Sequence, residues 1–312
     1  MKNNKRGDFD FEWLFALIAG AVILVLAVYG AMKIGDTAGN LADSEIAKQI
    51  SIITDPLQAG FASGSFGKIS FNQEVKVTNT CFDEGFGKND IGVSTKTKDG
   101  WRVEGQRTSI HNKYIFSPEN SGKVFYVFSK PFFLSYKVAD LIMITSQSQD
   151  YCFVSAPQEI EDELKGLNIP NVQIGNCSDT SLKVCFNSGN CDVGVYGTCM
   201  LNCESRYDEG YVEKDGMKMD YTGSLMYAAI FSDKGTYDCN VKRLLYRTSK
   251  IADVFSQKAE LMNLRGCNTN MQADLLMFES ITGNASVSNI ISINQIAKDI
   301  EIKNEASLCR IW

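Results

Sequence analysis

Ten cysteines are the residues of this chain whose types and spacing most directly imply chemistry. All of them follow an apolar N-terminal segment, and none lies within or before it. An even number of cysteines on one side of such a segment is typical of disulfides formed in an oxidising compartment. We therefore predict five disulfides, whose connectivity the sequence does not specify. The cysteines are Cys81, Cys152, Cys177, Cys185, Cys191, Cys199, Cys203, Cys239, Cys267 and Cys309.

Four of these cysteines offer an alternative, because four thiolates can hold zinc tetrahedrally. Cys185, Cys191, Cys199 and Cys203 form a C-x5-C-x7-C-x3-C cluster. Zinc sites usually show two close pairs separated by a longer loop, whereas here only Cys199 and Cys203 are close in sequence. We therefore favour disulfides over metal, and we expect neither a metal nor another cofactor.

Motifs for catalysis are incomplete. His111 is the only histidine and hence the only imidazole for general-base catalysis, and no G-x-S-x-G nucleophile elbow accompanies it. The glycine-rich segment 60–70 resembles a phosphate-binding loop but lacks the glycine and the hydroxyl residue that the motif requires. The acidic stretch 208–220 lacks the spacing of a calcium-binding loop. We therefore assign no catalytic residue.

Composition bounds the class of protein. The chain has 312 residues, with 37 acidic against 31 basic side chains and a formal net charge of -6. A nucleic-acid partner is not expected, because binding it requires an excess of Lys and Arg to replace phosphate counterions. Residues of the hydrophobic class make up 44% of the chain, which is enough to fold rather than stay disordered. The length suits roughly two domains of about 150 residues each.

The apolar N-terminal segment has the length of a membrane span. Trp13 to Met32 is a run of 20 residues without a charge, and a helix of this length covers about 30 Å of hydrocarbon. Lys2, Lys5 and Arg6 precede it and favour an N-terminus on the inner side. We therefore expect a single-pass protein of the cell membrane with most of the chain outside the cytoplasm.

Two acceptor sequons agree with an outside location. Asn176 and Asn284 each begin an N-x-S tripeptide, and both follow the apolar segment. Glycosylation of such asparagines places them on the surface of a secreted or extracytoplasmic domain. They are candidate modification sites.

Periodicity predicts an α+β fold: an N-terminal transmembrane helix, a disulfide-rich and mainly antiparallel β ectodomain, and C-terminal helices. The expected divisions are a cytoplasmic leader (1–12), the transmembrane helix (13–34), a helical stalk (35–57), a β-rich extracytoplasmic domain (58–235) and a helical C-terminal region (236–312). The clearest strands are Lys68–Phe71, Glu74–Asn79, Lys113–Phe116, Lys123–Ser129, Ala139–Thr145 and Tyr151–Ser155, and the predicted helices are Pro157–Leu167, Tyr237–Gly266, Met271–Ile281 and Ser286–Lys303.

The leader MKNNKRGDFDFE, followed at once by the apolar run, resembles the class III signal of type IV pilins and related archaeal surface proteins. The resemblance implies that a peptidase cuts after Gly7, that Asp8 becomes the new N-terminus, and that Glu12 pairs with the terminal amine of a neighbouring subunit. The alternative, which we favour, is an ordinary signal anchor that is not cleaved.

Three segments further along the chain, 113–117, 128–132 and 137–142, together with the anchor, look like those of uncharacterised single-pass membrane proteins of small-genome (DPANN-type) archaea. This resemblance implies no activity.

We therefore expect a membrane-anchored extracytoplasmic surface protein with a structural or interaction role, in one version pilin-like. Its expected partners are membrane lipid and proteins, including copies of itself, that meet the transmembrane helix or the C-terminal helices. The alternative is a membrane-tethered extracytoplasmic enzyme of unknown substrate. A deep pocket with convergent ionisable groups around His111 or the acidic strands would favour the enzyme.

Overall fold

The computed structural model describes residues 18–29, 66–187, 191–200 and 203–312. The predicted leader and stalk lie outside these ranges, as do both ends of the predicted transmembrane segment. Residues 18–29 are helical. Within the described ranges, no helix has both the length and the apolar character that a membrane crossing requires.

The first sheet contains seven strands in the order β3-β2-β1-β6-β7-β5, with β4 paired to β2. The predicted strands Lys68–Phe71 and Glu74–Asn79 are parts of one long strand, β1, whose register against β6 shifts between Ser70 and Val75. The strands are β1 (Phe66–Phe82), β2 (Lys88–Thr97), β3 (Gly100–Trp101), β4 (Thr108–His111), β5 (Tyr114–Phe116), β6 (Asn120–Leu134) and β7 (Tyr136–Ser146).

Alternating residues of this sheet face two separate cores. One face forms a core among the strands of this sheet, through apolar residues such as Val77, Ile91 and Phe125. The opposite face, which includes Phe128 and Phe132, packs against the helices and the second sheet. Apolar residues therefore occur at both odd and even positions of these strands, because both faces of the sheet are buried.

The second sheet has the strand order β13-β12-β11-β10-β8-β9. Strands β9, β8, β10 and β11 run parallel, whereas β11, β12 and β13 form antiparallel pairs. The predicted α+β class is confirmed, with this parallel group as an addition to the antiparallel pattern. The elements are β8 (Tyr151–Val154), α2 (Gln158–Leu167), β9 (Val172–Ile174), β10 (Leu182–Phe186), β11 (Val193–Gly197), β12 (Glu209–Lys214) and β13 (Met217–Thr222).

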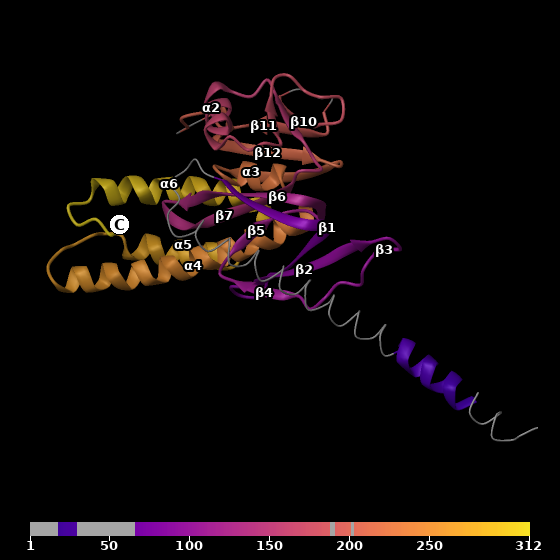
Figure 1. Cartoon of the computed structure of the whole chain (residues 1–312). Coiled ribbons are helices and arrows are strands. Elements are labelled where there is room, and N and C mark those ends of the chain that lie inside the picture. The colour runs from indigo at the N-terminus through magenta and orange to yellow at the C-terminus, as the bar shows by residue number, and fades with distance from the viewer. Residues whose placement is uncertain (1–17, 30–65, 188–190, 201–202) are drawn as a thin grey trace, which may run out of the picture.

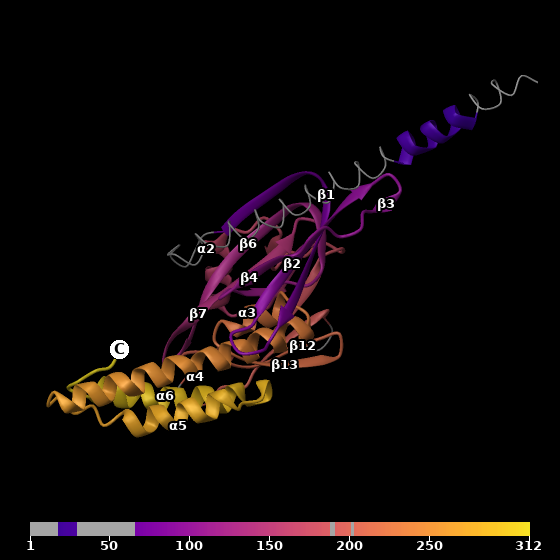
Figure 2. The same cartoon turned by 90° about the horizontal axis from the view of Figure 1, so that it is seen from below.

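Helices complete the fold (Figure 1). The buried helix α3 contacts strands of both sheets, and α4, α5 and α6 lie side by side and extend beyond the sheets (Figure 2). The three long helices confirm the predicted ones, whereas α3 has apolar residues on every side and hence no helical period to detect. The helices are α3 (Leu225–Ile230), α4 (Lys234–Leu264), α5 (Gln272–Gly283) and α6 (Ile290–Ala306), with short 3-10 turns at Arg206–Asp208 and Val287–Asn289.

All ten cysteines are paired, which confirms the predicted five disulfides. Cys81–Cys239 joins the end of β1 to α4, over a sequence separation of 158 residues. The other four disulfides close shorter loops. Three of them lie in the region of the second sheet, and the fourth joins residues of the C-terminal helical region. They are Cys152–Cys177, Cys185–Cys191, Cys199–Cys203 and Cys267–Cys309.

We predict that the long-range disulfide contributes more stability than the shortest one. In the chain-entropy model, a crosslink over 158 residues contributes about 5 kcal/mol and one over 4 residues about 2 kcal/mol. Replacing Cys81 and Cys239 by Ala should therefore lower the free energy of unfolding by about 3 kcal/mol more than replacing Cys199 and Cys203. Chemical denaturation of the two double variants measures this difference, and equal losses would contradict the prediction.

Candidate functional site

A hollow of 930 Å³ lies between α4 and the beginning of β7. We call it the α4 groove. Five of its residues lie at positions i, i+3, i+4, i+7 and i+8 of α4 and hence on one face of that helix. Its lining consists of Phe86, Asn112, Lys137, Val138, Ala139, Asp140, Arg247, Lys250, Ile251, Val254 and Phe255.

The position of α4 beside the sheet is fixed by Arg243, one turn before the groove. This side chain is fully buried. Its guanidinium donates to the carbonyls of Phe86 (2.9 Å) and Lys113 (3.0 Å), and to the side-chain oxygens of Asn89 (2.5 Å) and Asn240 (2.8 Å). Burial lowers the pKa of Arg243 to about 10, so the cation persists at neutral pH. Four oxygen acceptors thus replace its water shell.

Local sequence makes room for this guanidinium. Gly87 has a φ of 57°, in the left-handed region, and a Cβ there would lie 2.0 Å from the Phe82 carbonyl and 2.8 Å from Arg243. A glycine is therefore required in the turn between β1 and β2. Cys239, one turn before Arg243, carries the disulfide to Cys81 on the same hairpin. A covalent bond and a charged hydrogen-bond network thus hold the same two elements together.

Tyr114 lies close both to the buried Arg243 and to Arg247 of the groove. The Arg243 guanidinium lies 4.8 Å from the centre of the Tyr114 ring, a cation–π arrangement. Among the described residues the buried Tyr114 hydroxyl has no hydrogen bond of good geometry, and its polar neighbour is the Arg247 side chain. Burial raises the pKa of Tyr114, while the nearby charges of Arg247 and Arg243 and a side-chain contact with Arg247 oppose that rise. The phenol is therefore neutral and lies close to the Arg247 cation at the groove.

The groove carries an excess of positive charge. The Nε of Arg247 donates to the Val138 carbonyl at 2.8 Å, which holds the guanidinium at the wall formed by β7. Lys137 pairs with Asp140 at 2.9 Å, and the Lys250 ammonium lies 5.3 Å from the ring of Tyr246. Within the part of the chain that the structure describes, neither Arg247 nor Lys250 forms an ion pair with a carboxylate.

The other end of the groove is apolar. Phe255 packs edge-to-face on Tyr136, with ring centres 4.9 Å apart, and against Trp312 at 5.2 Å. Ile251 continues this wall, and Val254 remains 61% exposed at the rim. The α4 groove therefore combines two cations without acidic partners among the described residues with an aromatic and aliphatic surface.

A second hollow, the acidic cleft, lies between α6, the end of β13 and the segment that precedes β12. Its 470 Å³ is lined in part by Glu204, Asp208, Lys298, Glu301 and Glu305. Burial, and next the charge of Glu305, raise the pKa of Glu301, while Lys298 opposes the rise. The negative charge of this cleft is therefore only partly compensated.

A buried ion pair lies next to the acidic cleft and shares Lys298 with it. Glu209 is 3% exposed and accepts hydrogen bonds from Asn294 at 2.8 Å and from Lys298 at 3.2 Å. These contacts fix α6 to the start of β12. Because its polar groups satisfy one another, we interpret this pair as structural.

The adjoining hollow, of 310 Å³, contains Lys130, Glu163 and Tyr227. Lys130 forms an ion pair with Glu163, which also accepts a hydrogen bond from the Tyr227 hydroxyl. Burial lowers the pKa of Lys130. Since these groups pair with one another and join β6 to α2 and α3, they tie the first sheet to two helices.

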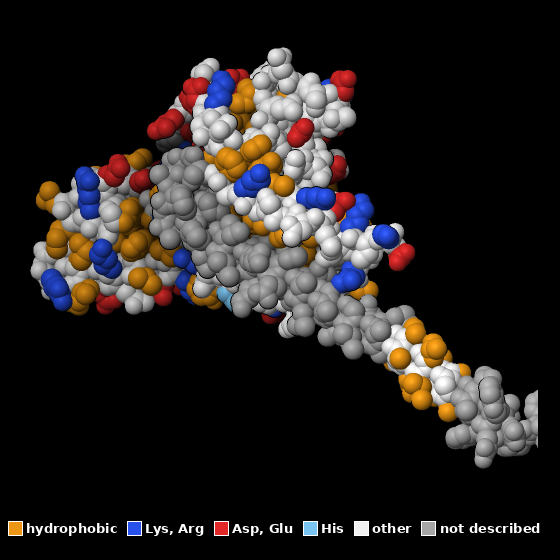
Figure 3. All heavy atoms as spheres, viewed as in Figure 1, with side chains coloured by type: hydrophobic (Ala, Val, Ile, Leu, Met, Phe, Trp, Pro, Cys, Tyr) orange, Lys and Arg blue, Asp and Glu red, His pale blue; other side chains and the backbone are white. Residues whose placement is uncertain are grey.

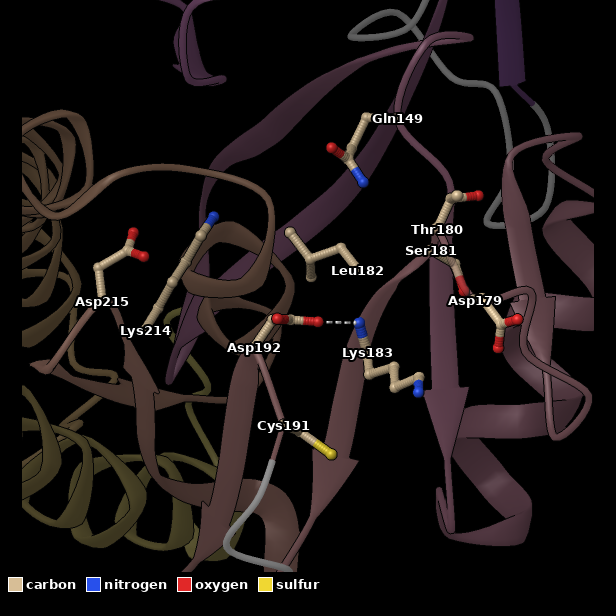
Figure 4. Close-up of a pocket in the computed structure, with 10 residues that line it drawn as sticks. All are labelled: Gln149, Asp179, Thr180, Ser181, Leu182, Lys183, Cys191, Asp192, Lys214 and Asp215. Atoms are coloured by element: carbon tan, nitrogen blue, oxygen red, sulfur yellow. Dashed lines mark hydrogen bonds between the residues drawn. The ribbon is translucent and has the colours of Figure 1, made fainter.

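The hollow in Figure 4, of 670 Å³, lies at the amino ends of β10 and β11. Lys214 donates to the carbonyls of Ile230 and Ser232, and burial lowers its pKa. Asp192 accepts from the backbone N–H of Lys183 at 2.7 Å, the interaction dashed in Figure 4. Ligands of parallel sheets bind at the carboxyl ends of strands instead. This hollow therefore fits a ligand less well than the α4 groove.

The residues singled out in the sequence do not gather at one place. Gly7, Asp8 and Glu12 lie outside the described residues. Among the residues that are described, His111 is exposed on β4 and belongs to the lining of none of these hollows. Asn176 and Asn284 are exposed, in the loop after β9 and at the end of α5, where a glycan would have room.

The cysteine cluster weighed as a zinc site is divided between two disulfides, Cys185–Cys191 and Cys199–Cys203. Asp208 brings a carboxylate close to the second pair. Sulfurs joined in disulfides are not thiolate ligands, so the disulfide interpretation holds over the metal alternative.

Sequence reasoning missed the cations of the α4 groove. It placed Ile251, Val254 and Phe255 on one apolar stripe but assigned no role to Arg247 and Lys250 on the same helical face. The i, i+3, i+4 spacing of these cations with the apolar residues was the available signal. No family model, curated protein or solved structure matches this chain. Geometry and charge therefore carry the interpretation of the groove.

We predict that Arg243→Leu lowers the free energy of unfolding by about 3 kcal/mol or more, because it leaves several buried oxygens without their charged donor. The matched control is Lys242→Leu on the neighbouring residue, whose ion pair with Asp83 is exposed and contributes at most about 1 kcal/mol. Denaturant unfolding of the oxidised chain measures both. Similar effects of the two substitutions would rule out a central role for Arg243.

We predict that Glu301→Gln stabilises the protein at pH 7 by about 0.2–0.5 kcal/mol, the size of a like-charge pair at i and i+4. The folded-state pKa of Glu301 is raised above its ordinary 4.5, so this group favours folding in acid and loses that contribution as the pH rises through its folded pKa. The gain from the substitution should therefore disappear below pH 4.5. Unfolding curves at pH 7 and in acid test this, and a gain independent of pH would refute it.

Proposed function

We propose that this chain is a membrane-anchored extracytoplasmic surface protein with a binding role, and that the α4 groove is its ligand-contacting surface. The observation that carries the proposal is the complete pairing of ten cysteines, all C-terminal to the apolar segment. Disulfides of this number persist in oxidising compartments and are rare in the cytosol. They support an outside location for the domain.

The helix at residues 18–29 supports the anchor. Its side chains are apolar and exposed, with Ile23 at 67% and Val25 at 66%, and its apolar surface is evident in Figure 3. A helix that is apolar on all sides is stable when lipid or protein covers it. We infer that it forms part of the predicted membrane span (13–34), with the N-terminus inside.

The enzyme alternative has less support. A catalytic site is expected to bring an acid or base together with a nucleophile or oxyanion donors. Within the described residues, His111 lies apart from the hollows, and the buried Lys130, Glu163 and Tyr227 are engaged with one another. The α4 groove offers cations and apolar walls, which are features of binding.

A role in assembly accompanies this proposal. Large apolar side chains remain exposed on the helical region, including Leu264 (79%) and Leu308 (103%), and offer contacts for protein partners. The pilin-like version adds cleavage after Gly7 and pairing of Glu12 with a neighbouring subunit, and it remains a proposal from the leader sequence.

Site-specific proteolysis of spheroplasts tests the topology. A cleavage sequence inserted after Val103, which is 84% exposed between β3 and β4, should be cut by protease added outside intact spheroplasts. The same sequence inserted after Asn4 is the matched control and should be cut only after lysis. Protection of the site after Val103 together with cleavage of the lysed sample would overturn the extracytoplasmic placement.

A further inference from the structure

We propose that the α4 groove binds an amphiphilic carboxylate, with its anionic head at Arg247 and Lys250 and its apolar body along Ile251 and Phe255. This inference rests on the proposed binding role and names the ligand class of the same groove.

The hydrogen bonding of the Arg247 guanidinium indicates where the anionic head of the ligand binds. Its Nε is used by the Val138 carbonyl at 2.8 Å, which orients the planar group without neutralising it. The guanidinium also contacts the Tyr114 hydroxyl, but this phenol is neutral and leaves the positive charge uncompensated. The cation can therefore still donate to a carboxylate oxygen of a ligand. Lys250 adds a second positive charge one turn away on the same helical face.

The acidic side chain in the groove does not neutralise these cations. Asp140 pairs with Lys137 at 2.9 Å, so its charge is already compensated. A cationic or neutral head would leave Arg247 and Lys250 without a counterion, whereas an anionic head supplies one. Charge complementarity therefore selects an anion.

The apolar walls select the rest of the ligand. Phe255 is supported by Tyr136 and Trp312 and presents a fixed aromatic surface, while Val254 at the rim is 61% exposed. Covering such surface favours a hydrocarbon body, because apolar area is removed from water. A volume of 930 Å³ accommodates a head and a medium-length chain together.

Calorimetric titration of the full-length oxidised chain in lipid nanodiscs with decanoate tests the proposal, with empty nanodiscs subtracted. We expect saturable binding of decanoate and binding that is roughly tenfold or more weaker for Arg247→Gln, since a charge-assisted contact is lost. Decanol, which has the same chain without the charge, should bind more weakly than decanoate.

Two further variants keep the test independent of folding. Val254→Asp changes an exposed rim residue and places a negative charge beside the ligand, so it should weaken decanoate binding while the unfolding transition stays unchanged. Arg265→Gln, at the exposed end of α4 outside the groove, is the matched control and should bind like the unmodified chain.

Any of these results would overturn the proposal: no saturable binding beyond empty nanodiscs, equal binding of decanol and decanoate, or unchanged binding by Arg247→Gln and Val254→Asp. Tighter binding of decyl phosphate than of decanoate would also overturn it, by assigning the groove to phosphate heads. The topology experiment remains separate, because decanoate binding does not depend on the side of the membrane. If the site after Val103 is protected in intact spheroplasts while decanoate still binds, the extracytoplasmic placement is refuted and the ligand proposal is not.

Discussion

A buried guanidinium determines how the helical region attaches to the first sheet. Arg243 lies on α4 and donates to oxygens that belong to the β1–β2 hairpin and to the segment between β4 and β5. Withdrawing a cation from water is costly unless its donors are satisfied. Here neutral oxygens and the Tyr114 ring surround it, so the helix has one favourable position relative to both segments.

The remaining features of the α4 groove follow from that position. Cys81–Cys239 attaches α4 covalently to the same hairpin, and one turn beyond Arg243 the helix presents Arg247 to the Val138 carbonyl of β7. Two turns further on, Phe255 meets Tyr136 and Trp312. Successive turns of α4, which lies against β7, therefore provide first the charged end of the groove and then its apolar end.

The sequence predicts those elements whose packing is periodic. The stripe through Val241, Leu244 and Leu245 predicted α4 because each of these residues is buried on one face. By contrast, β2 has polar residues at Asn89 and Asp90 and was not among the predicted strands. Asn89 is nevertheless fully buried, because Arg243 and Asn79 satisfy its amide.

The groove could not be predicted for a related reason. In the sequence, Arg243 resembles an ordinary helical surface cation, and its burial depends on acceptors as far as 157 residues away. The pairing of the cysteines is likewise a property of the folded chain, although their even number and common side of the apolar segment indicated that they pair. Local patterns specify elements, whereas these long-range contacts specify how they meet.

Peptide mass mapping of the native protein without reduction tests this arrangement most directly, because it determines the oxidised state and the attachment of α4 together. We expect a linked peptide pair that contains Cys81 and Cys239, and no free thiol at either residue. Free thiols at these residues would contradict both the attachment of α4 and the oxidising location inferred from the disulfides. A bond from Cys81 to any other cysteine would contradict the attachment of α4 alone.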